Sequence, residues 1–427
     1  MQIFVRFMLL SFSVSNFKSF RDEQVLDLKA DAIKPAFSWL ENAAVAVGKE
    51  DKALRVKALY GANASGKSNL IKALRVMLSI SLTGGPKPGA LAELEGFAFD
   101  PELRHSPSTF ELEFTTDQRR YRYGFRADMA CFQEEWLYDE TVRKAKVFVR
   151  NGQTVSIGKK FFEHPETVAI LERGDNSLFR QETSFLSALS FFDVGAAIRH
   201  TVQFLSGITV INNTEEVHVE QSAYQFLVGE PMQRKVRGLL DYAGIRFDDL
   251  MVMDKEDPKF SKPELLERTR GRYSLMTAYK TGVNEGTDFA WLAEQGESQG
   301  TQKLLTLAPY VVRAIEQGSV LFIDEFEAKL HTRLSREIVA MFNSSAGNPN
   351  NAQFIFSTHD TNLLDHRLLR RDQIDFVDKG ADRASMLYSL SDVKGIRKDA
   401  DFERDYLGGS YGAVPEVTDF NIAILED

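Results

Sequence analysis

A glycine-rich segment near the amino terminus has the spacing of a phosphate-binding loop. Residues 61–68 read Gly-Ala-Asn-Ala-Ser-Gly-Lys-Ser, which fits the pattern G-x-x-x-x-G-K-[ST]. Glycines let the backbone turn tightly enough for its N–H groups to surround phosphate oxygens, and a following helix N-terminus adds a favourable dipole. In such a loop Lys67 brings a positive charge to the β- and γ-phosphates, and Ser68 brings a hydroxyl to Mg²⁺. The segment therefore predicts a site for a nucleoside triphosphate and Mg²⁺.

A second segment, far along the chain, ends in two carboxylates. Residues 320–323 are apolar without alternation, as in a strand covered on both faces, and Asp324 and Glu325 follow them. Acidic residues at the carboxyl end of a parallel strand lie where α/β sheets bind ligands. We expect Asp324 to hold Mg²⁺ and Glu325 to orient and polarise an attacking water. Taken alone, the segment is explained equally well as a solvated strand end; its pairing with the glycine loop favours the catalytic interpretation.

The surrounding sequence predicts the elements that position both segments. An apolar stretch at 56–60 precedes the glycine loop, and a helical pattern follows it from 69 to 82. Helical patterns and apolar strands alternate around the second segment, at 303–317, 320–323, 333–342 and 353–356. This alternation is typical of a parallel α/β sheet, so both segments are expected in one folded lobe.

The region between the two segments has a different character. Residues 109–114 and 119–126 predict an antiparallel hairpin, and further short strands run to about 158. Arginines and aromatics interleave at 119–126 as on a nucleic-acid surface, but pairing of these arginines with acidic residues across the hairpin is the explanation we favour. Residues 160–250 look mostly helical without sustained heptads, and short strands return from about 250 to 292.

The predicted fold class is α/β, with a parallel sheet core, an antiparallel β lobe and an inserted compact helical subdomain. We expect residues 8–158 to form the first part of the main lobe, 159–250 the helical insertion, and 251–427 the second part. An alternating stretch at 11–17 is interpreted as a first strand and not as part of a signal segment, and either Met1 or Met8 could be the native start.

Composition narrows the classes of function. The 427 residues carry a net charge of −9, which argues against general coating of nucleic acid or of an anionic membrane, while a local basic groove stays open. The single cysteine, Cys131, excludes an intrachain disulfide and a Cys-rich zinc site, and it predicts a cytoplasmic protein. No apolar run reaches transmembrane length, so we expect no membrane partner.

Two further motifs complete an ordered set. Residues 297–302 read Glu-Ser-Gln-Gly-Thr-Gln before the helix that leads to the Asp-Glu strand, and residues 356–360 read Phe-Ser-Thr-His-Asp after the next strand. With these four elements in order, the chain resembles the ABC-type ATPases of the SMC, RecF and OLD branch. Within that branch it is similar to the compact AAA-family ATPases of bacterial anti-phage systems, of the PARIS or abortive-infection type. The resemblance covers residues 8–82 and 290–427, and the middle only in outline.

The resemblance implies a set of residues that bind ATP and Mg²⁺. In the glycine loop these residues are Gly61, Asn63, Gly66, Lys67, Ser68 and Asn69. Ser298, Gly300 and Gln302 match part of an L-S-G-G-Q signature, which in such proteins caps the γ-phosphate bound by the opposite protomer. A homodimer or higher homo-oligomer with sandwiched ATP is therefore implied, although Glu297 and Gln299 depart from the signature.

One histidine and one loop also have counterparts in that branch. His359 corresponds to the switch histidine that touches the γ-phosphate, and residues 327–331 occupy the position of the D-loop. A helix N-cap remains an alternative for Ser298, and a hydrogen-bonded surface histidine for His359. His331 stays undecided, and Gln133 is a weak candidate for the glutamine that couples nucleotide to the inserted lobe.

The implied activity is hydrolysis of ATP to ADP and phosphate. The expected role is a sensor or scaffold in anti-phage defence that gates a separately encoded effector, such as a TOPRIM-like nuclease. Segments 368–373 and 406–415 resemble the C-terminal sequence pattern of those small ATPases. The alternative is a RecF- or SMC-like DNA-repair ATPase that clamps DNA on ATP-driven dimerisation, so direct DNA binding stays open. The acids at 399–405 suit an exposed polar segment better than a nuclease metal site, and the trigger is not encoded in any motif.

Overall fold

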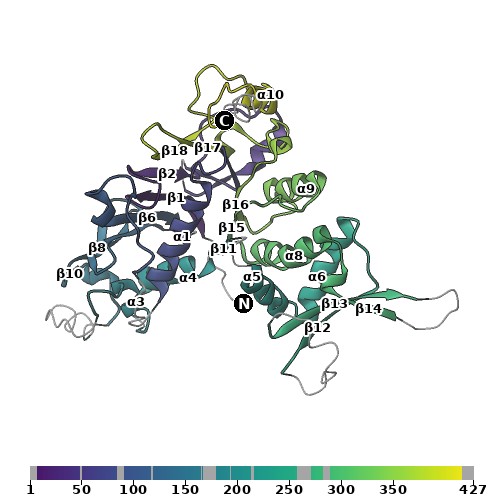
Figure 1. The fold of residues 1–427 in the computed structure, drawn as a ribbon. Helices are drawn as coiled ribbons and strands as arrows, with labels where there is room; N and C mark the ends of the chain where they lie inside the picture. Colours follow the sequence, from purple (N-terminus) through teal and green to yellow (C-terminus); the bar gives the residue numbers. More distant parts are fainter. Residues whose placement is uncertain are drawn as a thin grey trace, which may run out of the picture.

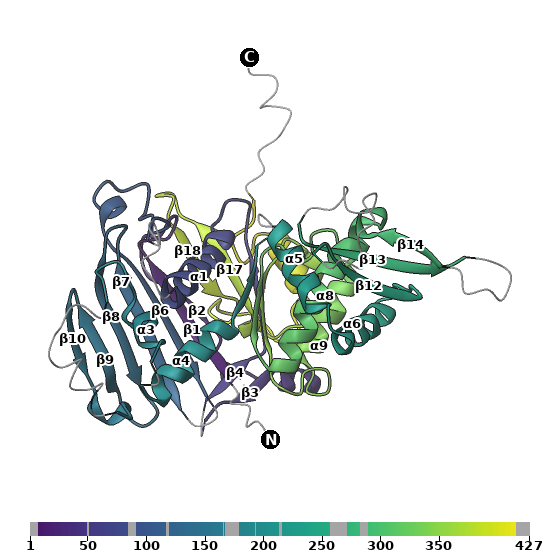
Figure 2. The ribbon, with the colours of Figure 1, turned by 90° about the horizontal axis from the view of Figure 1, so that it is seen from below.

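The computed structural model describes residues 7–48, 51–83, 91–116, 119–164, 166, 179–192, 194–212, 216–256, 271–281 and 289–415. Across these residues the strands form a seven-stranded sheet, a six-stranded sheet and two smaller sheets of three and two strands. Figures 1 and 2 show the seven-stranded sheet at one end of the molecule and the three-stranded sheet at the other, with the six-stranded sheet between them.

The six-stranded sheet is the parallel part of the fold. Its order is β11-β15-β16-β5-β17-β18, in which the neighbours from β11 to β17 are parallel and β18 is antiparallel. The strands are β11 (Thr209–Ile211), β15 (Val320–Ile323), β16 (Gln353–Ser357), β5 (Val56–Tyr60), β17 (Ile374–Lys379) and β18 (Ser385–Ser389). Every residue of β5, β15 and β16 is buried, as their unalternating apolar sequences predict.

Helices on both faces account for this burial. They include α1 (Lys67–Leu82), α8 (Gln299–Gln317) and α9 (Thr332–Asn343). Phe322 of β15 belongs to the apolar core that contains α1, whereas Leu321 and Ile323 belong to the core that contains α8 and α9. Successive side chains of a strand thus enter opposite cores, and the predicted parallel α/β lobe is confirmed.

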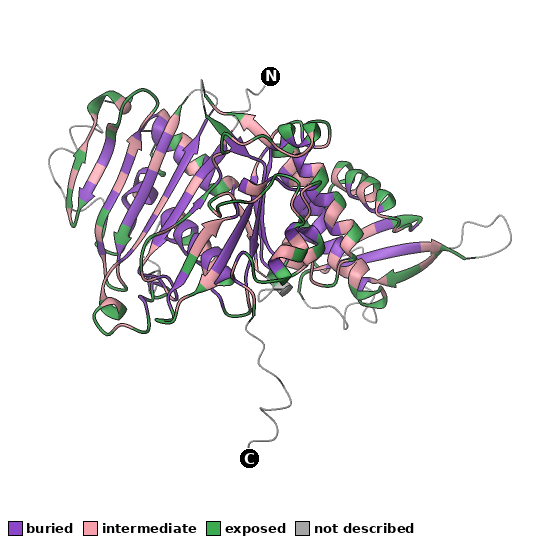
Figure 3. Cartoon of the chain, turned by 90° about the horizontal axis from the view of Figure 1, so that it is seen from above, coloured by how far each residue is buried: buried purple, intermediate pink, exposed green. Residues whose placement is uncertain are grey.

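The seven-stranded sheet is antiparallel throughout. Its strands, in spatial order, are β10 (Thr154–Ile157), β9 (Ala145–Asn151), β8 (Phe132–Asp139), β7 (Arg120–Ala127), β6 (Ser108–Thr115), β1 (Met8–Ser15) and β2 (Gln24–Asp27). Figure 3 shows buried and less buried residues along these strands, and the two alternate over most of β8 and the first half of β6, where one face of the sheet packs on the core. A short pair, β3 (Ala44–Ala46) and β4 (Lys52–Leu54), lies beside β1.

The predicted hairpin at 109–126 is confirmed as β6 and β7, with Thr109 opposite Arg126. Its arginines pair with acidic side chains: Arg119 lies 2.6 Å from Asp139, and Arg122 lies 3.2 Å from Glu111. Arg120 also pairs with an acid across the hairpin. The arginine-rich strand is therefore neutralised within its own sheet, which confirms the explanation favoured from the sequence.

The segment 159–250 does not fold as one packing unit. Among its described residues, the helices α3 (Phe185–Leu189) and α4 (Ala196–Gly207) pack against α1, and β11 then joins the parallel sheet. Its later helices, α5 (Glu216–Phe226) and α6 (Glu230–Tyr242), pack against α8 instead. The helical part of the insertion is thus divided between two cores, because the chain crosses the parallel sheet at β11.

The remaining elements pack against α5 and against β17. A three-stranded sheet of β12 (Asp249–Asp254), β13 (Tyr273–Lys280) and β14 (Phe289–Ala293) lies against α5. The last helix, α10 (Phe402–Leu407), places the Tyr406 ring in a stack on Phe376 of β17, with centroids 5.3 Å apart. None of the helices in the described ranges has the length and hydropathy that crossing a membrane requires.

A buried carboxylate links the antiparallel sheet to α3. Glu135 of β8 is fully buried and accepts hydrogen bonds from the backbone N–H groups of Phe185 and Leu186, at 2.6 and 2.9 Å. Arg150 of β9, also fully buried, lies 3.5 Å from this carboxylate and donates to the Thr183 carbonyl at 2.6 Å. One charge pair therefore joins two strands and the start of a helix.

Replacing Glu135 by alanine is expected to lower the free energy of unfolding by about 3–5 kcal/mol, because the Arg150 charge would stay buried without its partner. Urea unfolding followed by circular dichroism measures the change. The matched control is Glu134→Ala on the same strand, whose half-exposed carboxylate lies 4.0 Å from Arg126 and should contribute under about 1 kcal/mol. Equal effects of the two changes would contradict a structural role for the buried pair.

Candidate nucleotide site

The strand order brings the separate sequence motifs to one edge of the parallel sheet. The glycine loop follows β5, Asp324 and Glu325 follow β15, and His359 follows β16, which lies between the other two strands. The charges of Asp324 and Glu325 act to raise the pKa of the Lys67 ammonium, and the charge of Lys67 acts to lower the pKa of His359. Four of the predicted residues therefore lie within electrostatic reach of one another.

The glycine loop is packed tightly against the hairpin of β17 and β18. Gly61 and Gly66 have φ angles of 152° and 123°, which only glycine adopts without strain. A Cβ atom at Gly61 would overlap the Val377 carbonyl oxygen, and one at Gly66 would overlap the Ser385 hydroxyl. That hydroxyl donates to the Ser65 carbonyl at 2.5 Å, so a hydrogen bond from the start of β18 fixes the backbone of the loop.

Lys67 lies inside the curve of the loop. Its ammonium donates to the carbonyl oxygens of Gly61 and Ala62, at 2.7 and 3.0 Å. Burial lowers its pKa, although the charges of Asp324, Glu325 and Glu327 act in the opposite direction. A buried cation inside a glycine cradle that has no room for a Cβ suits the phosphate groups of a nucleotide.

The other predicted loop residues have different surroundings. The side chains of Asn63 and Ser68 are exposed, at the tip of the loop and in the first turn of α1. The Asn69 amide donates to the Ser19 hydroxyl at 2.8 Å, which ties the start of α1 to the turn after β1. Asn69 therefore positions the helix through that turn.

Ser357 at the end of β16 fixes the two acidic residues. Its hydroxyl donates to the Asp324 carboxylate, and it accepts a hydrogen bond of 2.8 Å from the Glu325 backbone N–H. Asp324 is buried, whereas Glu325 is exposed and has a φ of 48°, in the left-handed region. The turn after β15 thus directs one carboxylate inward and leaves the other accessible.

The donor set suits Mg²⁺. Asp324 and Ser68 offer a carboxylate and a hydroxyl oxygen, and Mg²⁺ is usually held by one or two carboxylates together with substrate phosphates. Within the described ranges no three His, Cys, Asp or Glu side chains cluster as in a protein-only metal cage. The residues present therefore fit a metal that arrives with the nucleotide.

His359 follows β16 and is anchored through its backbone. Its N–H donates to the Glu327 carboxylate at 2.7 Å. Desolvation by its surroundings, and next the charge of Lys67, lower the pKa of the imidazole below its usual value. At neutral pH this favours the uncharged imidazole, which has one nitrogen to donate and one to accept a hydrogen bond.

The signature-like segment lies at the N-terminus of α8. Ser298 caps the helix, since its hydroxyl accepts from the Thr301 N–H at 3.2 Å. Gln302 donates to the Glu297 carbonyl at 2.8 Å, and a Cβ at Gly300 would lie 3.0 Å from the Lys329 carbonyl oxygen. The helix-cap alternative for Ser298 is therefore observed, and the segment abuts residues 327–331.

Glu297, which departs from the signature pattern, has its own partners on β13. Its carboxylate accepts hydrogen bonds from the Thr277 and Tyr279 hydroxyls, at 2.5 and 2.8 Å. Thr277, Tyr279 and Ser385 lie outside every motif that the sequence offered, and nothing in the sequence connects them to the site. Ser357 and Glu327 lie within predicted motifs, at 356–360 and 327–331, but the sequence does not predict their hydrogen bonds to Asp324, Glu325 and His359.

The two undecided residues have structural partners. His331 caps α9, because its Nδ1 accepts from the Arg333 N–H at 3.1 Å. Gln133 lies on β8 of the antiparallel sheet, where its amide donates to Asp128 at 2.5 Å. These contacts are those of a helix cap and of a strand-end hydrogen bond, respectively.

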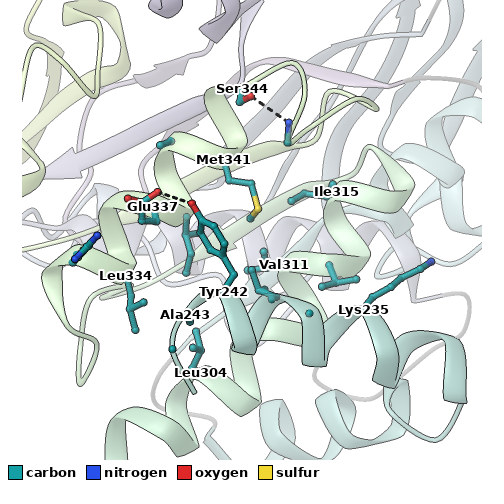
Figure 4. Close-up of a pocket in the computed structure, with 18 of the residues that line it drawn as sticks. Lys235, Tyr242, Ala243, Leu304, Val311, Ile315, Leu334, Glu337, Met341 and Ser344 are labelled. Atoms are coloured by element: carbon teal, nitrogen blue, oxygen red, sulfur yellow. Dashed lines mark hydrogen bonds between the residues drawn. The ribbon is translucent and has the colours of Figure 1, made fainter. Parts of the chain in front are cut away.

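A wide cavity lies apart from this site. It has a volume of about 980 Å³ and is bounded by α6, α8 and α9, with Leu239, Val311 and Met341 among the apolar residues of its wall. In Figure 4 the Tyr242 ring crosses toward Glu337, with an OH to carboxylate distance of 3.5 Å. None of the site residues predicted from the sequence lines this cavity, so it is separate from the predicted nucleotide site.

Comparison with protein families identifies the chain. The sequence model of the family described as "AAA domain, putative AbiEii toxin, Type IV TA system" matches residues 57–365. The chain belongs to this family. The match begins within β5 and extends past β16, so this AAA domain contains the glycine loop, the signature-like segment, the Asp-Glu strand and His359. The resemblance to compact AAA-family ATPases expected from the sequence is thereby confirmed.

Solved structures of SMC head domains are similar to this chain at low identity. An SMC head bound to the C-terminal winged-helix domain of ScpA has 13% identity and a TM-score of 0.45, covering 89% of this chain and 97% of that one. A head with a coiled coil and joint from Pyrococcus yayanosii has 11% identity and a TM-score of 0.45, covering 95% of this chain and 99% of that one. No curated protein matches the sequence.

The contact behind the glycine loop leads to a prediction. Gly66→Ala should weaken ATP binding roughly tenfold or more, because an L-residue is strained at this φ and the new methyl group must displace Ser385. Isothermal titration calorimetry measures the affinity. Gly207→Ala is the matched control, since an added Cβ there meets nothing within 4 Å. Unchanged ATP affinity in Gly66→Ala would contradict the conclusion that Ser385 packs too closely against Gly66 to leave room for a side chain there.

Proposed function

We propose that this AAA domain binds ATP with Mg²⁺ and hydrolyses it to ADP and phosphate. The observation that carries the proposal is the convergence of Lys67, the Asp324–Glu325 pair and His359 at the ends of three adjacent parallel strands. A phosphate cradle, a pair of carboxylates and a histidine at one sheet edge are the parts that phosphoryl transfer to water requires.

Each residue has a distinct proposed role. Backbone N–H groups of residues 61–68 and the N-terminus of α1 bind the phosphates, and Lys67 neutralises charge that develops on them. Ser68 and Asp324 hold Mg²⁺, which when bound neutralises phosphate charge. The exposed Glu325 carboxylate orients a water and accepts its proton. Neutral His359 hydrogen-bonds the terminal phosphate.

We further propose that hydrolysis takes place between two copies of the chain. Ser298, Gly300 and Gln302 lie at the start of a 19-residue helix, and the N–H groups of such a start attract a phosphate. Their contacts run to Glu297 and to residues 327–331, which follow the catalytic pair. The signature of one protomer would thus meet the γ-phosphate of its partner and complete a homodimer around ATP.

The biological role that we propose is a sensor or scaffold in anti-phage defence that gates a separately encoded effector. The family description, a toxin of a type IV toxin–antitoxin system, supports a two-component setting. The alternative of a DNA-clamping repair ATPase has less support, because Arg119, Arg120 and Arg122 are paired with acids and the net charge is −9. A TOPRIM-like nuclease is the effector that we expect.

Substitution at the proposed general base should separate binding from turnover. Glu325→Gln is expected to bind ATP like the wild type but to hydrolyse it at least about a hundredfold more slowly, because an amide cannot accept the proton from water. The trapped protein should elute as a dimer with ATP in size-exclusion chromatography with light scattering. Lys67→Ala, the control, should neither bind ATP nor dimerise. Normal hydrolysis by Glu325→Gln would refute the assignment of the base.

The purified chain should leave nucleic acids intact when it is given ATP and either Mg²⁺ or Mn²⁺. The acids of the closing region are engaged elsewhere: Glu403 accepts from Thr361 at 2.7 Å, and Asp405 accepts from Tyr411 at 3.3 Å. Gel analysis of plasmid DNA and transfer RNA provides the test. Cleavage that survives purification and disappears in Glu403→Gln would show that the chain is itself the effector.

A further inference from the structure

An exposed aromatic ring beside the glycine loop lies close to two cations. The side chain of Phe99 is 49% exposed, and its ring centroid is 5.9 Å from Lys379 Nζ and 5.1 Å from the Arg383 guanidinium carbon. Lys379 Nζ also donates to the carbonyl of Ala64 at 3.4 Å, at the tip of the loop. The ring and both cations therefore border the phosphate cradle.

Phe99 is held in place by its own segment. Its ring packs edge-on against buried Phe97, with centroids 5.6 Å apart, and the Phe97 N–H donates to Asn16 at 2.9 Å. The preceding Glu95 accepts from Lys18, through an ion pair of 2.8 Å. The segment that presents the ring is thus fastened to the turn that follows β1.

The two cations are held by the β17–β18 hairpin. Lys379 is the last residue of β17, and Arg383 lies in the turn that follows, with a φ of 65° in the left-handed region. Asp382 in the same turn pairs with Arg21 at 2.6 Å, and its carboxylate also accepts from the Ala384 N–H at 3.1 Å. These contacts fix the conformation of the turn, and with it the position from which the Arg383 side chain extends.

The positions of these groups match the direction in which a nucleotide must lie. The reactive groups follow β15 and β16, on one side of β5, whereas Lys379 and Arg383 come from β17 and its turn, on the other side. A terminal phosphate beside Glu325 and His359 leaves the rest of the nucleotide to extend away from β15 and β16. That direction leads from the loop toward Lys379 and Phe99.

We propose that Phe99 and Arg383 form a platform on which the base of the bound nucleotide stacks, with Lys379 beside the phosphate nearest the sugar. The proposal rests on the ATP site proposed above. Aromatic rings and guanidinium groups both bind the face of a base, and a Phe–Arg pair offers both surfaces. Because every purine has such a face, the platform itself holds adenine and guanine alike, and it makes no contact with tripolyphosphate.

The test compares ligands with and without a base. Isothermal titration calorimetry, in the presence of Mg²⁺, measures the affinities of the wild type and its variants for ATP, GTP and inorganic tripolyphosphate. Phe99→Ala should weaken ATP and GTP about tenfold each and leave tripolyphosphate unchanged. Phe99→Trp should retain ATP binding, because it keeps the stacking face. Phe192→Ala, at a residue with 57% exposure near α3, is the matched control and should change nothing.

The outcomes separate this inference from the proposed function. If Phe99→Ala weakens ATP and tripolyphosphate equally, or weakens neither, the platform is refuted while the ATP site stands. If the wild type binds none of the three ligands, or Lys67→Ala binds ATP normally, the ATP site itself is refuted. Arg383→Gln provides a second variant at an exposed residue, so that a folding defect in Phe99→Ala leaves the test intact. Its ATP affinity should fall several-fold, again without change for tripolyphosphate, and an unchanged ATP affinity would refute the part of Arg383.

Discussion

The register of three parallel strands is the constraint on which the site depends. β16 pairs with β15 on one side and β5 on the other, so that Phe356 lies level with both Ile323 and Ala58. The chain segments that leave these strands are far apart in sequence but emerge at one edge of the sheet. A slip of one residue would turn Ser357 to the opposite face and break its contacts with Asp324 and Glu325.

The parts of the fold that the sequence predicts well are those encoded by local patterns. Strands β5, β15 and β16 carry apolar runs without alternation, which burial on both faces requires, and their observed bounds match the predicted ones closely. The hairpin of β6 and β7 was predictable because its alternation and its charge pairs are visible in adjacent segments. The glycine loop is equally local, since its tight turns need glycine at Gly61 and Gly66.

Features that depend on distant neighbours were not predictable. The sequence indicates that 160–250 is mostly helical, but helical periodicity does not show which core a helix joins, so the division of this segment between two cores was not predictable. The hydrogen bond from Ser385 to the glycine loop and the hydrogen bonds to Glu297 depend on which strands are neighbours, and no single stretch of sequence encodes that order. The proposed roles of Ser298, Gly300 and Gln302 stay predictions, because they concern a second copy of the chain.

Hydrogen bonds from β13 to Glu297 connect the three-stranded sheet to the start of α8. Thr277 and Tyr279 both donate to one carboxylate, and Glu297 is bonded through its carbonyl to Gln302 in the first turn of the helix. A displacement of β13 therefore either breaks two short hydrogen bonds or carries the helix start with it. Strands β13 and β14 project from the body of the molecule (Figure 2), and the hydrogen bonds to Glu297 join this projection to the signature-like segment.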